Sequence, residues 1–197
     1  MIKKRLRSLA FTISLVGSTL LAQGSDIDSD TFSLVGLEGS YSSLDYENGT
    51  RTDNTQGSES LGGLGLKIGA ESKDFRIFLG AHYFVDSESK YDYIVTYGAA
   101  LQYKFNVLQI ANIFVGINGG IANMKFRTDG EDFSRTLQEP YVGGDIGTNI
   151  HFGRSIDFEV GARIMSIQGD NTINSVTYHV GSIVSGYGTL IFKWQMD

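Results

Sequence analysis

The alternation of side-chain character along the chain most constrains what it can fold into. From Thr31 onward, apolar residues alternate with polar residues or glycine at a period of two, the repeat of a β-strand. Breaks divide the pattern into eight stretches, and no run of ten residues or more carries the 3.6-residue period of a helix. We therefore predict eight strands, at residues 31–42, 60–71, 75–86, 91–105, 111–126, 138–152, 155–168 and 177–194.

The breaks between the predicted strands alternate in length. In chain order they are long, short, long, short, long, short and long: 43–59, 72–74, 87–90, 106–109, 127–137, 153–155 and 169–176. In an up-and-down antiparallel sheet, this order places every long loop at one end and both termini at the other. Short periplasmic turns and long external loops are typical of transmembrane β-barrels.

One face of each predicted strand is apolar, whereas the other mixes glycine with charges of both signs. In the strand 155–168, for example, Phe158 and Val160 alternate with Asp157 and Glu159. Glycine, which makes up 25 of the 197 residues, would weaken a strand on a water-exposed face without any gain in packing. Inside a narrow barrel it leaves room for long charged side chains that pair with one another. We therefore predict that the apolar face meets lipid and the mixed face lines the lumen.

Ten charged residues, five acids and five bases, are predicted to face the lumen. Because eight strands leave an interior only wide enough for side chains, we interpret them as a salt-bridged filling rather than as a gated ion path or a catalytic cluster. We expect Glu38 to pair with Lys67 or Lys193. The ten residues are Glu38, Lys67, Arg76, Asp92, Lys104, Asp145, Asp157, Glu159, Arg163 and Lys193.

The N-terminal segment predicts export. MIKKRLRS carries four basic residues and precedes the apolar run LAFTISLVGSTLLA, which is typical of a signal peptide and short for a membrane-spanning helix. Cleavage is expected after Ala22 or Gly24, and an uncleaved anchor helix is the alternative. Loss of these four bases would take the net charge from −6 to −10, which disfavours nucleic-acid binding. The predicted organisation is a signal peptide at 1–22, a polar leader at 23–30 and a barrel domain at 31–197.

Taken together, the pattern over residues 31–194 resembles the small eight-stranded outer-membrane barrels of the OmpA transmembrane-domain and OmpX type. The last predicted strand ends in GYGTLIFKW, with Leu190, Phe192 and Trp194 at every second position, and it looks like the C-terminal signal that such barrels present to the barrel-assembly machinery. The QMD that follows and the position of Gly188 depart from that pattern. The resemblance implies an all-β, eight-stranded antiparallel up-and-down transmembrane barrel. It also implies a monomer in the bacterial outer membrane, in contact with its lipid and lipopolysaccharide.

No catalytic residue, cofactor or metal site is predicted. Cysteine is absent, and the three histidines, His82, His151 and His179, are scattered along the chain. Barrels that deacylate lipid A carry a His-x-Ser step on one strand, which none of the three provides. Barrels that transfer palmitate combine an Asp-Ser pair with a histidine in external loops. Asp86-Ser87 begins such a loop, but no histidine lies clearly in one.

The sequence leaves several functional classes open. The main interpretation is a protein for envelope integrity or adhesin-like surface interaction, with the polar external loops as the candidate surface for host or other surface ligands. A small-solute channel and a lipid A-modifying enzyme are alternatives within the same fold. A soluble, exported, lipocalin-like binder is the alternative outside it.

Overall fold

The computed structural model describes residues 31–50, 53–86, 91–126, 135–173 and 176–195. At some strand ends it describes the backbone alone, namely at 46–50, 53–56, 86, 91–92, 126, 135–137, 168–173 and 176–180. The predicted signal peptide and leader lie outside the described residues.

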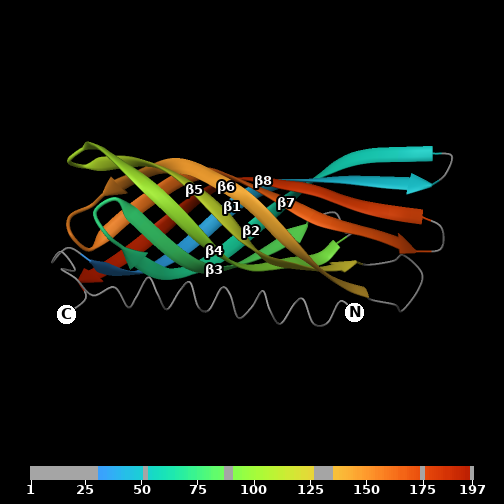
Figure 1. The fold of residues 1–197 in the computed structure, drawn as a ribbon, viewed down its shortest axis with the longest axis horizontal. Coiled ribbons are helices and arrows are strands. Elements are labelled where there is room, and N and C mark those ends of the chain that lie inside the picture. The colour runs from blue at the N-terminus through green and yellow to red at the C-terminus, as the bar shows by residue number, and fades with distance from the viewer. Residues whose placement is uncertain (1–30, 51–52, 87–90, 127–134, 174–175, 196–197) are drawn as a thin grey trace. The chain divides into compact units, whose positions relative to one another are not determined.

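Eight antiparallel strands close into a barrel in the order of the sequence, which confirms the predicted fold (Figure 1). Each strand pairs with the next, and β8 returns to pair with β1 from Phe32↔Gln195 to Gly49↔Thr177. The strands are β1 (Phe32–Thr50), β2 (Asp53–Glu71), β3 (Phe75–Asp86), β4 (Tyr91–Leu108), β5 (Ala111–Phe126), β6 (Arg135–His151), β7 (Ile156–Ile173) and β8 (Val176–Gln195).

The two ends of the barrel differ. At the turn end, named for its short turns between β2 and β3, β4 and β5, and β6 and β7, strand bounds agree with the predicted ones to within three residues. Gly153, in the β6–β7 turn, has a φ of 81°, a backbone conformation that favours glycine. At the opposite end, the hairpin end, β1 and β2 continue to Thr50 and Asp53, and β7 and β8 meet at Ile173 and Val176.

The predicted loops 43–59 and 169–176 are therefore mostly strand, and their assignment as loops was wrong. These segments lack a period-two pattern because both of their faces are largely polar. Their backbones nevertheless form continuous ladders, which run from Thr50↔Asp53 between β1 and β2 and from Ile173↔Val176 between β7 and β8. Backbone hydrogen bonding, rather than burial of one face, defines these strands.

A belt of exposed apolar side chains surrounds the middle of the barrel. It includes Leu64, Leu79, Ile117 and Ile146, whose exposed fractions run from 57% to 72%. The faces predicted from the alternation are confirmed, since Val160 and Ile164 are exposed whereas Asp157, Glu159 and Arg163 between and beside them are buried. No helix in the described part of the chain is long and apolar enough to cross a membrane.

The interior of the barrel has two kinds of filling. Charged and amide side chains fill it from the turn end, together with a few apolar ones such as Leu34, Phe78 and Ile191, whereas ten buried apolar or aromatic residues fill it near the hairpin end. The packed polar lumen predicted from the sequence thus applies to only part of the barrel. This apolar cluster comprises Leu44, Leu61, Phe84, Ile94, Ala122, Met124, Tyr141, Met165, Ile167 and Ile183.

Around the apolar cluster, the outside of the barrel changes from apolar to polar. Asp45, Ser58, Ser60, Gln138 and Ser166 are exposed there. On β1, β2 and β7 the strands at this level are thus apolar inside and polar outside, the reverse of the belt region. Val85 on β3, Ile121 on β5 and Val184 on β8 are still apolar and exposed beside the cluster.

Candidate functional site

The predicted lumen charges are the first candidate site, and nine of the ten have described side chains. All nine point into the barrel, and none of their side chains is substantially exposed. Asp92 lies where the structure describes only the backbone. Glu71, a residue that the sequence reading missed, also lies inside, so the interior described here holds five acids and five bases.

An alternating chain of acids and bases runs through the middle of the lumen. Glu38 on β1 accepts two hydrogen bonds from Arg163 on β7, at 2.9 and 3.0 Å. Its Oε2 also lies 2.6 Å from Lys67 Nζ on β2. Lys67 in turn lies 3.0 Å from Glu159 Oε1, and Arg76 on β3 lies 2.9 Å from Glu159 Oε2. Four strands are joined across the barrel by these contacts, which include the expected Glu38–Lys67 pair.

A second group of ion pairs closes the turn end. Glu71 contacts Arg76 and lies 3.1 Å from Lys104. Lys193 Nζ lies 2.9 Å from Asp157 Oδ2 and 3.7 Å from Glu71 Oε1. Lys193 therefore pairs with Asp157 and Glu71 and not with Glu38, the other partner expected for that residue. Glu71 follows Lys67 by four residues on the same face of β2, a signal by which the alternation could have found it.

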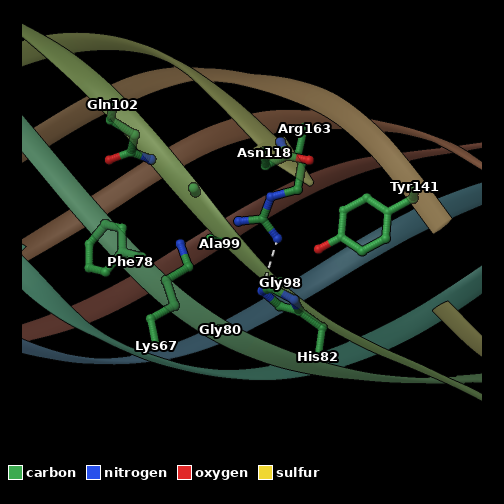
Figure 2. Close-up of a pocket in the computed structure, with 11 residues that line it drawn as sticks. Lys67, Phe78, Gly80, His82, Gly98, Ala99, Gln102, Asn118, Tyr141 and Arg163 are labelled. Carbon is green, nitrogen blue, oxygen red and sulfur yellow. Dashed lines mark hydrogen bonds between the residues drawn. The ribbon is translucent and has the colours of Figure 1, made fainter. Parts of the chain in front are cut away.

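Amide side chains surround the remaining space. Gln102 donates to Asp145 at 2.5 Å, and Asn149 accepts from Arg76 at 2.9 Å. Figure 2 shows the lining of the cavity that remains, with Lys67, Arg163 and His82 directed toward one another. The volume in which the centre of a water molecule fits is about 20 Å³, which is room for roughly one or two waters.

His82 makes the contacts that most resemble a catalytic arrangement. Its Nδ1 lies 3.3 Å from Thr96 Oγ1, and its Nε2 lies 3.3 Å from Glu38 Oε1, as in a hydroxyl–imidazole–carboxylate triad. However, Arg163 Nη1 lies 3.0 Å from the same Nε2. The guanidinium of Arg163 and the carboxylate of Glu38 thus both contact Nε2, so the contacts of His82 do not single out one tautomer. Thr96 is fully buried in the lumen, so its hydroxyl is not directed toward the lipid side of the barrel.

The other two histidines do not complete a site in the described residues. His151 Nδ1 lies 2.8 Å from Asp157 Oδ1, and its Nε2 lies 3.1 Å from Asn112 Nδ2. The amide of Asn112 thus occupies the nitrogen that a base would need free. The side chain of His179 lies outside the described ones. No group of three or more histidine, aspartate or glutamate residues within the described ranges could hold a metal ion.

Solved structures provide the comparison with known proteins, since no protein-family model and no curated protein sequence matches the chain. Neisserial surface protein A superposes with a TM-score of 0.56 at 13% identity, over 81% of this chain and 97% of that one. Neisserial surface protein A is a bacterial outer-membrane β-barrel protein. OprH from P. aeruginosa superposes with a TM-score of 0.49 at 19% identity, over 84% of this chain and 99% of that one. The N-terminal barrel domain of P. aeruginosa OprF superposes with a TM-score of 0.48 at 13% identity, over 82% of this chain and 97% of that one.

The outer-membrane β-barrel fold orients the chain. In barrels of this fold the short turns face the periplasm, so we expect the turn end there, the hairpin end outside and the apolar belt in the hydrocarbon layer. Aromatic pairs lie at both borders of the belt, as interfacial girdles do. Tyr103 packs edge-on against Phe75 and Phe105 at the turn end, with ring centroids 5.1 and 4.8 Å apart. Tyr83 stacks on Tyr93 at 5.9 Å toward the hairpin end.

Proposed function

We propose that the protein is a closed, non-conducting outer-membrane barrel that holds a folded β-sheet at the cell surface for interaction with other molecules. The observation that carries this proposal is the double filling of the lumen. Ion pairs cross it from the turn end to its middle, and the apolar cluster fills it toward the hairpin end.

This filling argues against a small-solute channel. A permeating ion would have to separate buried ion pairs such as Glu38–Arg163 and then cross the apolar cluster. The position of Thr96, which is fully buried in the lumen, argues against an enzyme that acts on lipid A from the membrane side.

The external sheet supports a surface role. Beyond the apolar cluster, β1 pairs with both β2 and β8, and β7 pairs with β8. The order β2–β1–β8–β7 therefore continues outward as a four-stranded sheet, visible in Figure 1 as the paired ends that extend to the right. A closed barrel beneath it provides a rigid support. We further propose that Leu190, Phe192 and Trp194, exposed on the lipid side of β8, present the signal for the assembly machinery.

A trimmed variant separates the surface role from a role in envelope integrity. Residues 47–56 are replaced by Asn-Gly, a sequence that favours a two-residue hairpin turn. We expect the variant to keep the heat-modifiable gel mobility of a folded barrel and the antibiotic tolerance of the cells, but to lose cell adhesion. Loss of tolerance with unchanged adhesion would instead assign the protein to envelope integrity.

Two further measurements test the closed lumen and the absence of catalysis. In planar bilayers we expect no discrete conductance steps from the purified protein, and regular steps would contradict the proposal. In cells that express the protein we expect an unchanged lipid A mass spectrum. A new acylation state would identify it as an enzyme.

A further inference from the structure

The outer part of β2 forms an open edge of the external sheet. β2 pairs with β1 along its whole length, from Thr50↔Asp53 to Phe32↔Glu71. Its pairing with β3 runs only from Glu71↔Arg76 to Leu61↔Asp86, because β3 ends at Asp86. Among the residues that the structure describes, no strand pairs with the β3 side of residues 53–60. This segment is called the β2 edge below.

A hydrogen bond in the turn between β2 and β3 shows which backbone groups point toward the β2 edge. Ser72 donates its N–H to the Phe75 carbonyl at 2.8 Å, so residue 72 is hydrogen-bonded toward β3. Backbone direction alternates along a strand, and the ladders of β2 show no register shift. The even-numbered residues of the β2 edge therefore direct their N–H and C=O groups away from β1, toward the open side. They are Asn54, Gln56, Ser58 and Ser60.

An edge of this kind is a template for another strand. Its eight residues span about 26 Å at roughly 3.3 Å per residue, enough for a partner strand of similar length. The sequence DNTQGSES contains no apolar side chain, so an apolar anchor is not what the β2 edge selects. Main-chain hydrogen bonds and charge remain as the means of recognition.

The charge around the β2 edge selects the partner. Residues 45–60 contain four acids and one base, a net charge of −3, and Asp86, the last residue of β3, adds an acid beside Leu61 where the β2 edge begins. By contrast, residues 166–182 at the other edge of the sheet contain one acid and no lysine or arginine. A cationic strand is thus favoured at the β2 edge, and a polyanion is repelled.

We propose that the β2 edge binds an extended, cationic polypeptide segment, which adds to the external sheet as a further strand. This inference rests on the proposed surface role and names the class of partner. Recognition through the backbone tolerates many partner sequences, provided that lysine or arginine recurs along the strand. Binding weakens as salt screens the acidic surroundings.

The test uses the full chain in lipid nanodiscs and three fluorescein-labelled nonapeptides. The first alternates lysine and threonine, the second is the same peptide N-methylated at four consecutive central residues, which removes N–H groups from both of its edges, and the third replaces lysine with glutamate. Fluorescence polarisation is measured at 50 and 300 mM salt. We expect the first peptide to bind at least tenfold more tightly than the other two, and more weakly at the higher salt.

Substitutions in the β2 edge locate the binding. Gln56→Pro removes one outward N–H without removing a bond to β1, and proline is tolerated on an open edge. We expect it to weaken binding of the lysine peptide about threefold to tenfold, the effect of one hydrogen bond. The matched variant Gln56→Thr keeps the N–H and should bind as the original does. Gel mobility of unheated samples verifies that both variants fold.

Each contrary result overturns a stated part of the proposal. Equal binding of the N-methylated peptide would exclude strand addition, and preferential binding of the glutamate peptide or of heparin would exclude a cationic partner. An unchanged affinity in folded Gln56→Pro would place binding elsewhere. If no peptide binds but the trimmed variant still abolishes adhesion, the surface role stands and the edge inference fails. If the peptide binds and trimming leaves adhesion unchanged, the edge binds but the surface role fails.

Discussion

The membrane section and the outer section of this barrel use opposite side-chain patterns on the same strands. On β7, Arg163 points inward and Ile164 outward, whereas Met165 and Ile167 point inward and Ser166 outward. On β1, Glu38 is buried beside the exposed Leu37, and Leu44 is buried beside the exposed Asp45. The pattern reverses along an unbroken strand. The surrounding solvent, and not the backbone, therefore decides which face is apolar.

Because the apolar face differs between the two sections, different interactions stabilise each of them. In the membrane section, lipid and a buried apolar interior are equivalent for an aliphatic side chain, so burial inside the barrel offers it little gain. The interior instead holds charges that bridge the strands. In the outer section water surrounds the strands, and burial of the apolar cluster is favourable as in a soluble protein. Each section should therefore be sensitive to a different kind of substitution.

The largest expected effect comes from Glu38→Gln in the membrane section. Glu38 lies against Lys67 and Arg163, and its loss leaves the guanidinium of Arg163 without a carboxylate partner at this position. Loss of one member of a buried pair costs about 3–5 kcal/mol, measured from urea unfolding in detergent micelles. Leu37→Ile, at the neighbouring lipid-facing position, is the control and should change stability by less than about 1 kcal/mol. An unchanged urea midpoint for Glu38→Gln would mean that the pairing is not structural.

In the outer section, the apolar cluster should respond to loss of volume. Leu61→Ala, at a side chain that is 1% exposed, is expected to reduce stability by about 2–5 kcal/mol. Leu64→Ala, on the same strand but 72% exposed to lipid, should have a much smaller effect because it leaves no cavity. The same urea titration compares the two. Equal losses would mean that the apolar cluster is not a packed core.

Arginine substitutions on the outer face of β2 should locate the border between the sections. Leu66→Arg places a charge in the apolar belt and should cost about 2–4 kcal/mol if it lies near the membrane midplane. Ser58→Arg, on the same face but beside the apolar cluster, should cost about 0–1 kcal/mol because the side chain meets water. Unfolding in lipid vesicles measures both. A large cost at Ser58 would show that the membrane reaches the outer section.

The alternation of side chains predicted the parts of the strands that form the belt region and their two faces, and it placed nine of the buried charges on the inward face, because a side chain's face follows directly from its position along a strand. The pairing partners could not be predicted in the same way. Glu38 meets Arg163 across the barrel at a separation of 125 residues, and that contact depends on the stagger of the strands, which no single strand encodes.

Two other features illustrate the limits of the pattern. Leu44, Leu61, Met165 and Ile167 occupy inward positions of their strands. The apolar cluster could therefore be predicted by extending the inward face of each strand beyond the belt. The outer hairpin of β1 and β2 was not, since residues polar on both faces match a loop as well as a strand. Only the ladder between the two strands distinguishes them.

The smallest predicted effect concerns a single hydrogen bond near the border between the membrane section and the outer section. Tyr41, which is 69% exposed, donates from its hydroxyl to Ser60 Oγ at 2.9 Å on the outer face. A double-mutant cycle of Tyr41→Phe and Ser60→Ala measures their coupling free energy. If this bond is wetted, the coupling should be at most about 0.5 kcal/mol, because water replaces the lost partner. A coupling above about 1.5 kcal/mol would instead place Ser60 in an apolar medium, so that the reversal of pattern on β1 and β2 would begin within the membrane and not at its surface.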